Sequence, residues 1–541
     1  MTAPSPLERF LEQDHRPGTN LKGDAPRATW RFLLPDPAPT TITFVGRPPK
    51  GELRDLRREI DVRVVDEGEA VAAGGVVVVR RGDPARYLVA GSGTVLWERR
   101  FAKGPSSMPA ATAYRLTPAH GELRTATPLA DAVAWRDHLR ANQDAVSFGL
   151  GSISRVRRSL GSAATLGAGG GDPGSRGWKR PLLRTAARIA LGGSTAIERW
   201  ARRHTPIVDR TLHVAGGGIG DGSLPTYLAE LAGSAPGRWW LSAPGDYRTQ
   251  KLLVHLAMPD AGSVIVKIGR DADTSGRVQH ATAMLRHLAG LSLAHGIVPR
   301  VAFSGSRGPH EIVGEHAVIG RPFESVSDGT HTCPHARRVV TALVELGAAS
   351  HAMPATDALD AVASQFLAAL PRETESGRRL RSDADALRSP SGVRDLPCVL
   401  MHGDPGTWNL LVDETGIGLL DWENGELAGV PGWDVLLFMH AYALHHDQLA
   451  GRPDRWSVVD RHFVERSPLS PLIEWGLREV AAVAGVAPST MTHLVASVLA
   501  YQSLKELPRL MVGERGVWLH ALDRWHRGAK GSWLSESLQH A

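Results

Sequence analysis

The pattern of apolar and polar positions predicts alternating strands and helices near the start of the chain. Short runs rich in Val, Ile and Thr lie at residues 41–45, 61–65 and 75–81, which is typical of buried strands. The charged segment 52–59 between the first two runs predicts a short helix. A strand, a helix and a strand at this spacing predict parallel pairing of the strands, and therefore an α/β domain.

The second half of the chain has a different pattern. Residues 238–271 alternate between apolar runs and glycine-containing turns, which predicts three strands, and the third of them carries Lys267. A helical pattern follows at 276–291, and almost the whole chain after residue 337 is helical in pattern. This order predicts an α+β domain with a small antiparallel sheet and a helical lobe. The remaining strands of the sheet are expected at 300–305 and 315–320.

Glycine-rich and basic segments separate the two patterns. Residues 161–177 contain Gly, Ser and Ala without a period, which predicts a linker. Residues 213–225 are also interpreted as linker, because they lack the Lys-Ser/Thr of a phosphate-binding loop. The segment 151–204 holds eleven Lys or Arg against two acidic residues, which predicts a solvated basic helix or a contact with a membrane surface or an anionic partner. The predicted domains are 1–150, 151–224, 225–322 and 323–541.

Composition narrows the class of protein. The chain has 541 residues, of which 42% are hydrophobic and 22% charged, as is typical of a globular protein with several domains. Two cysteines, Cys333 and Cys398, are too few for a disulfide framework, and no segment has the pattern of a signal peptide or a membrane span. These features predict a cytoplasmic protein. The net charge of +6 reflects the basic segment, so it does not predict nucleic-acid binding, and the oligomeric state stays open.

The stretch HGDPGTWNLLV, residues 402–412, joins polar residues to an apolar run. The runs NLLV and GIGLLDW predict a hairpin in which Asn409 begins one strand and Asp421 ends the other. Asp404 lies five residues before Asn409 on a loop that contains Gly and Pro, so the three side chains can converge. Two carboxylates and an amide offer oxygen ligands, which suit Mg²⁺ bound to phosphates rather than Zn²⁺. A nearby carboxylate that does not bind the metal can orient an alcohol and accept its proton.

The spacing HGD-x4-N followed by DWE resembles the aminoglycoside phosphotransferase and choline kinase-type family, which has a protein-kinase-like fold. The run ELAGVPGWDVLLF at 426–438 adds to the resemblance, which covers about residues 225–541. It implies a two-lobed phosphotransferase domain that binds ATP and Mg²⁺ and phosphorylates a hydroxyl group of a small molecule, either a sugar-like molecule or an amino alcohol. The chain offers no clear acidic cluster for a polycation, which argues against an aminoglycoside antibiotic as the acceptor.

The resemblance also implies roles for individual residues. Asp404 would be the catalytic base, Asn409 and Asp421 would hold Mg²⁺, and Lys267 would contact the α- and β-phosphates of the nucleotide. The loop over the nucleotide would contain Gly245, Asp246 and Tyr247. Two further residues would fix the catalytic loop, one as a structural clamp and one through hydrogen bonds: His402 and Asp434.

One position departs from the pattern of kinases. Kinases pair the strand lysine with a glutamate on the next helix, and at that position this chain has Ala281. The other groups that could serve Lys267 are Gln279, His280, Glu311 and Glu315. A lysine without a partner would be less well positioned for phosphoryl transfer. A nucleotide-binding pseudokinase that acts as an interaction or regulatory module therefore stays an alternative hypothesis.

The N-terminal region faintly resembles a class I methyltransferase-type Rossmann domain over residues 28–140. Its glycine segment from Gly46 to Gly51 is not GxGxxG, and two prolines there remove amide donors that a cofactor would need. Asp66 follows the second strand, where such proteins often bind a ribose, although an ordinary turn is the alternative. We therefore expect a degenerate Rossmann-like domain, with methyltransferase activity as the weaker hypothesis.

Overall fold

The structure, a computed structural model of the chain, divides into two compact units. The sheet unit consists of residues 22–279 and 301–317, and the helical unit includes residues 280–300 and 318–541. The structure describes residues 32, 39–48, 53, 56–57, 60–67, 69–71, 76–79, 94–100, 112–119, 122–128, 210–216, 224–233, 238–242, 251–258, 262–349, 356–369, 381, 396–452, 454–510 and 516–539. The predicted nucleotide loop with Gly245, Asp246 and Tyr247 and the basic segment 151–204 lie outside these residues.

The sheet unit contains a mixed sheet, one end of which is parallel. Strand β1 (Thr41–Val45) lies between β2 (Asp61–Val65) and β3 (Val76–Val79), and β3 pairs with β4 (Thr94–Arg100), all in parallel. Every residue of β3 is a buried valine, as is typical of a strand covered on both faces. The parallel pairing predicted for the first two strands is therefore confirmed.

The same sheet continues through antiparallel strands. β4 pairs with β7 (Arg210–Gly216), β7 with β5 (Thr112–Ala119), β5 with β6 (Glu122–Pro128), and β6 with β8 (Arg238–Ser242). The linker expected at 213–225 is therefore wrong for its first four residues, which belong to β7. Both partners of β7, which are β4 and β5, lie far before it in the sequence. β7 therefore joins strands from distant parts of the chain into one sheet.

The five strands predicted for a small antiparallel sheet are present, but they form one end of this twelve-stranded sheet and not a sheet of their own. They are neighbours in the order β8, β9 (Leu252–Met258), β10 (Gly262–Ile268), β13 (His310–His316) and β12 (Val301–Arg307). All of their pairings are antiparallel. The strand expected at 315–320 is shifted towards the N-terminus. Residues 308 and 309 form a two-residue turn, which sets Arg307 opposite His310 and starts β13 there.

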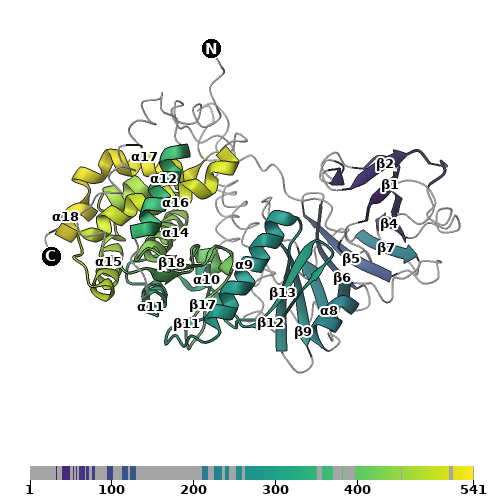
Figure 1. Ribbon diagram of the computed structural model, residues 1–541, viewed down its shortest axis with the longest axis horizontal. Helices are drawn as coiled ribbons and strands as arrows, with labels where there is room; N and C mark the ends of the chain where they lie inside the picture. Colours follow the sequence, from purple (N-terminus) through teal and green to yellow (C-terminus); the bar gives the residue numbers. More distant parts are fainter. Residues whose placement is uncertain are drawn as a thin grey trace, which may run out of the picture. The chain divides into compact units, whose positions relative to one another are not determined.

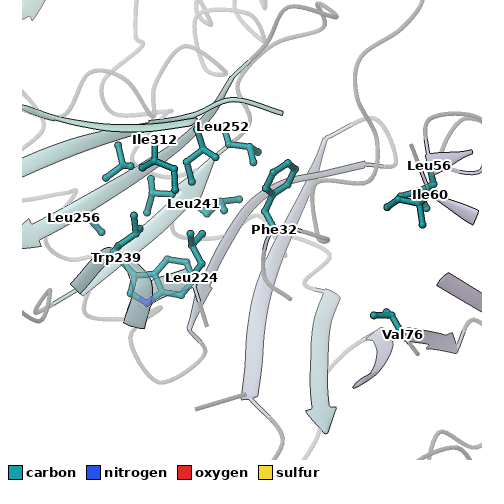
Figure 2. Packing of buried hydrophobic residues seen from close by; sticks show 14 of the residues in the cluster. Phe32, Leu56, Ile60, Val76, Leu224, Trp239, Leu241, Leu252, Leu256 and Ile312 are labelled. Carbon is teal, nitrogen blue, oxygen red and sulfur yellow. The ribbon is translucent and has the colours of Figure 1, made fainter. Parts of the chain in front are cut away.

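One face of this antiparallel part holds the core of the sheet unit. Figure 2 shows Trp239, Leu241, Leu252 and Ile312 gathered on that face, with Leu224 beside them. Leu224 belongs to helix α8 (Leu224–Ala232), which packs against β12. All five side chains are buried, so this face is closed to water.

The helical unit consists largely of α-helices (Figure 1). Helix α11 (Pro334–Ala348) buries Val339, Val340, Leu343 and Leu346, whose spacing of three and four residues forms one apolar stripe. The helical character predicted after residue 337 is confirmed. Among the described residues, no helix combines the length and the apolar character that a membrane span requires. The other helices are α9 (Ala272–Leu288), α10 (Phe323–Val326), α12 (Thr356–Ala369), α14 (Trp433–Leu449), α15 (Ser470–Ala484), α16 (Thr490–Leu510), α17 (Val517–Gly528) and α18 (Trp533–Gln539).

Candidate active site

The predicted hairpin brings two of the polar residues to one end. Strand β16 (Leu410–Val412) pairs with β17 (Ile417–Leu419) in antiparallel register. The backbone N–H of Leu420 donates to the carbonyl oxygen of Asn409 at 2.9 Å, which extends the pairing by one step. Asn409 therefore lies just before one strand and Asp421 just after the other, as the sequence predicts.

Hydrogen bonds from Asn409 connect Asp404 to this end of the hairpin. The amide nitrogen Nδ2 of Asn409 donates to the backbone oxygen of Asp404 at 2.9 Å and to its carboxylate Oδ2 at 3.2 Å. Asn409 itself is buried, which fixes this geometry. The Coulomb effect of Asp421 on the pKa of Asp404 shows that the two carboxylates are close enough to interact. The three predicted residues are thus brought together.

Two side chains fix the loop before Asp404. The carboxylate of Asp434, in the first turn of α14, accepts the backbone N–H groups of His402 at 2.6 Å and Gly403 at 2.9 Å. The His402 ring is fully buried, and its Nε2 bonds the carbonyl oxygen of Leu420 at 2.8 Å. Its Nδ1 accepts the N–H of Asp404 at 3.3 Å. Both His402 and Asp434 have the structural roles that the sequence predicts.

The backbone at Gly403 and at Asp421 has a left-handed conformation, which most residue types avoid. Gly403 has φ of +79°, and a Cβ there would lie 1.9 Å from the backbone oxygen of Asn424, so glycine is required. Asp421 has φ of 68°, the one positive value among the described non-glycine residues. Such a conformation is uncommon for an aspartate outside a turn and occurs often at functional sites. It turns the chain directly after β17, at the residue expected to bind a metal.

Electrostatics set Asp404 apart from an ordinary surface carboxylate. Burial raises the pKa of Asp404 to about 7, and the neighbouring carboxylates of Asp421 and Glu423 also raise it. Lys505 acts in the opposite direction, as does the side chain of Trp408. A carboxylate whose pKa lies near neutrality is suited to accept a proton during catalysis.

Helix α16 supplies groups that sequence analysis missed. The side-chain amide of Gln502 donates to the backbone oxygen of Gly403 at 3.4 Å, and the hydroxyl of Tyr501 donates to Glu426 at 3.2 Å. One turn further, the Lys505 Nζ lies 4.2 Å from the centroid of the Tyr501 ring. No local pattern in α16 indicates these contacts, because the helix is distant from the catalytic loop along the chain.

In the sheet unit, Lys267 has a carboxylate partner. Its Nζ lies 2.8 Å from Oε1 of Glu315, and the two side chains are only 7% and 6% exposed. Lys267 on β10 is opposite Val313, and Glu315 is opposite Ile265, so the pair is diagonal on one face of the two strands. Of the four alternatives to a helix glutamate, Glu315 is therefore the ion-pair partner.

The chemistry of the described residues fits a magnesium ion. Because Nδ2 of Asn409 is used by Asp404, the oxygens that would be offered to a cation are Oδ1 of Asn409 and the carboxylate of Asp421. Mg²⁺ prefers a few protein oxygens and completes its shell with water and phosphate oxygens. Within the described residues, no group of three or more His, Cys, Asp or Glu has the arrangement of a metal site. The ligand set expected here is smaller, because it consists of one amide and one carboxylate.

The antiparallel sheet with its buried Lys–Glu pair and the helical unit with its HGD loop define a kinase-like phosphotransferase fold. Residues 244–454 match the model of the phosphotransferase enzyme family, so the resemblance predicted from HGD-x4-N and DWE is confirmed for this part of the chain. The match begins at residue 244, so it gives no support to the Rossmann-like domain expected at 1–150.

Several solved structures are similar to this chain. A thermostable mutant of aminoglycoside phosphotransferase APH(4)-Ia, in a ternary complex with ADP and hygromycin B, has 14% identity and a TM-score of 0.40 over 57% of this chain and 99% of its own. Macrolide 2′-phosphotransferase MphH from Brachybacterium faecium has 16% identity and a TM-score of 0.36 over 52% and 90%. A glucosamine kinase in complex with glucosamine, ADP and inorganic phosphate has 13% identity and a TM-score of 0.32 over 59% and 87%. No curated protein matches the chain.

Proposed function

We propose that this chain transfers the γ-phosphoryl group of ATP to a hydroxyl group of a small molecule, with Mg²⁺ as the metal. The observation that carries the proposal is the convergence of Asp404, Asn409 and Asp421 at one end of a hairpin, in the segment that matches the phosphotransferase family. These are the side chains that phosphoryl transfer needs, namely a proton acceptor and oxygen ligands for a metal.

Asp404 would orient the acceptor hydroxyl and accept its proton. Its carboxylate is held by the Asn409 amide, and its loop is held by Asp434 and His402, so it cannot easily turn away from the substrate. The pKa of about 7 keeps the carboxylate ready to take up a proton near neutral pH. Most of the rate enhancement in such reactions comes from this kind of positioning.

Asn409 and Asp421 would hold the metal through their side-chain oxygens. When bound, Mg²⁺ neutralises negative charge on the phosphate oxygens as the phosphoryl group is transferred. Lys267 would contact the α- and β-phosphates, and Glu315 would keep its ammonium group in place. One of the grounds for the pseudokinase hypothesis was the missing helix glutamate, and the Lys267–Glu315 pair supplies a carboxylate partner from a strand instead.

The acceptor is expected to be a sugar-like molecule or an amino alcohol. The test is a measurement of ADP release from the purified full-length protein with Mg²⁺ and ATP or GTP, over a panel of both acceptor types, beside calorimetric titration of the nucleotide. We expect nucleotide binding that depends on Mg²⁺ and ADP release that depends on the acceptor. Binding without transfer to any acceptor would contradict the proposal and favour a nucleotide-binding module.

A further inference from the structure

His280, on helix α9, bonds the loop that follows the expected metal ligand Asp421. Its ring nitrogen Nε2 lies 2.7 Å from the backbone oxygen of Gly425. A carbonyl oxygen only accepts hydrogen bonds, so Nε2 carries the hydrogen and donates it. His280, Asp421 and Gly425 all belong to the helical unit. The bond therefore connects α9 to the loop of Asp421 within one compact unit.

Met284 packs beside the same loop. It lies one helical turn after His280, so the two side chains share one face of α9. A Cβ added at Gly425 would be 3.0 Å from Cε of Met284 and 3.2 Å from Cε3 of Trp422. Gly425 has φ of −63° and ψ of 145°, which any residue can adopt, so close packing and not backbone conformation favours glycine here. Helix α9 thus meets Gly425 through a hydrogen bond and through an apolar side chain.

The loop between Asp421 and Gly425 is one short turn that other buried groups also fix. Asp421 is the N-cap residue of the 3-10 turn Trp422–Asn424, and Gly425 follows this turn directly. The Trp422 ring is fully buried, and its centroid lies 4.6 Å from that of the His402 ring. The body of the turn is therefore fixed beside the catalytic loop, and its C-terminal end is fixed by α9. A hydrogen bond at that end limits the positions that the carboxylate of Asp421 can take.

This use of α9 differs from the kinase pattern, in which the helix supplies a glutamate to the strand lysine. Ala281 occupies that position and is completely buried, while Glu315 on β13 pairs with Lys267. His280, the residue directly before Ala281, bonds Gly425 instead. The lysine and the expected metal ligand are thus held by different elements, β13 and α9.

We propose that His280 is a positioning residue for metal binding, which holds the turn behind Asp421 through the backbone oxygen of Gly425. The inference rests on the proposed phosphotransferase function and deepens it, because it gives α9 a part in the binding of Mg²⁺. In this role His280 supplies no metal ligand and acts only through the loop.

The first experiment measures the binding of ATP to the full-length protein by calorimetry, at saturating Mg²⁺ and without the metal. In His280→Ala we expect the Kd for Mg·ATP to rise about fivefold, which is the usual weight of one hydrogen bond. The Kd for ATP without Mg²⁺ should change by less than about twofold, because the turn acts on the metal. In turnover assays the KM for Mg·ATP should rise by a similar factor, while the acceptor KM stays the same.

Two polar substitutions test whether the hydrogen bond itself is responsible. The amide nitrogen of a glutamine is as many bonds from Cβ as Nε2 of a histidine, so His280→Gln should restore the wild-type Kd for Mg·ATP. The side chain of an asparagine is one bond shorter, so His280→Asn should behave like His280→Ala. His287→Ala is the matched control, because His287 lies two turns later on the same helix and is exposed. Its Kd values should equal those of the wild type.

Binding without an acceptor distinguishes failure of this inference from failure of the proposed function. Mg·ATP binding that weakens in His280→Asn and recovers in His280→Gln, without turnover of any acceptor, would support the positioning role and contradict the phosphotransferase. Equal Kd values for Mg·ATP in His280→Gln and His280→Asn would overturn the inference about His280. So would a loss of affinity in His280→Ala that is the same with and without Mg²⁺, since such a loss indicates general damage to the site. A wild-type protein that binds ATP equally with and without Mg²⁺ would overturn both proposals.

Discussion

At the scale of single residues, Asp404 and Asp421 have different surroundings although they lie close together. Asp404 accepts a hydrogen bond from Asn409 and belongs to a loop fixed by buried groups. Asp421 stands at the end of β17 in a left-handed backbone conformation. Such a difference suits different roles, with proton acceptance at Asp404 and metal binding at Asp421, and each role can be tested by a substitution.

Asp404→Asn should abolish transfer and leave nucleotide binding almost unchanged. An amide keeps the size of the side chain and still accepts a hydrogen bond, but it cannot take up the proton of the acceptor hydroxyl. We expect kcat to fall about a thousandfold and the Kd for Mg·ATP to stay within about twofold, measured by ADP release and calorimetry. A variant that keeps a tenth of the wild-type kcat would remove Asp404 from the role of base.

Asp421→Ala should weaken the binding of Mg·ATP itself, because it removes one of two proposed metal ligands. We expect the affinity for ATP to fall at least tenfold with Mg²⁺ present and to change little without it. Calorimetric titrations with and without the metal measure both values, with Asp404→Asn as the control that keeps the ligand set. Equal affinities for Mg·ATP in the variant and the wild type would contradict the metal assignment.

The residues of the site differ in how far sequence could predict them. Asp404, Asn409 and Asp421 could be predicted because they lie on one loop and the hairpin that directly follows it, whose geometry is local. Gln502 and Lys505 could not, because they reach the loop from α16, and only tertiary packing brings that helix there. The positions of the loop and hairpin residues depend on local structure, whereas the positions of Gln502 and Lys505 depend on the whole fold.

At the scale of secondary structure elements, the pairing of β10 with β13 explains how Lys267 is held. Kinase-like sequences direct attention to the helix after the lysine strand, where this chain has no acidic residue in the expected position. The partner comes instead from β13, since antiparallel register sets Glu315 diagonally across from Lys267. Register between strands separated by a helix is not visible in the sequence, so Glu315 could be named only as one alternative of four.

Glu315→Gln should destabilise the sheet unit and weaken nucleotide binding. The substitution leaves the buried ammonium group of Lys267 without its charged partner, which costs about 3 kcal/mol of unfolding free energy. Urea unfolding monitored by circular dichroism measures this loss. Adding Lys267→Met to Glu315→Gln should recover part of the stability, because the unpaired charge is then removed.

Glu311 provides the matched control for this experiment. It lies on the same strand and is more exposed than Glu315, so Glu311→Gln should change the unfolding free energy by less than about 0.5 kcal/mol. If the losses from Lys267→Met and Glu315→Gln simply add in the double variant, the two side chains are not coupled, and the pair does not position Lys267.

At the scale of the whole molecule, the classes of structure could be predicted better than their connections. Parallel strands, a small antiparallel sheet and a helical part follow from periodicity, and all three are present. The continuity of the first two in one sheet could not be foreseen, because it depends on β7, whose partners β4 and β5 are distant along the chain. The glycines that follow β7 favour a linker interpretation. The strand itself is stabilised by its pairing with β4 and β5, so it is not recognised from the sequence.

The last prediction concerns the stability of the whole chain in mild acid. Burial lowers the pKa of His255, on β9, from 6.5 to about 4, so His255 stays neutral in the fold where an unfolded chain would take up a proton. Its contribution to stability is therefore complete above pH 6.5 and is lost as pH falls towards 4. Between pH 7.5 and 5.5 this residue alone should cost about 1 kcal/mol of unfolding free energy.

His255→Gln removes the titration, while Asp404 and Asp434, whose raised pKa values act in the opposite direction, titrate equally in both proteins. Urea unfolding at the two pH values should thus show a smaller acid loss in the variant, and an equal loss would mean that His255 is not the group that takes up the proton.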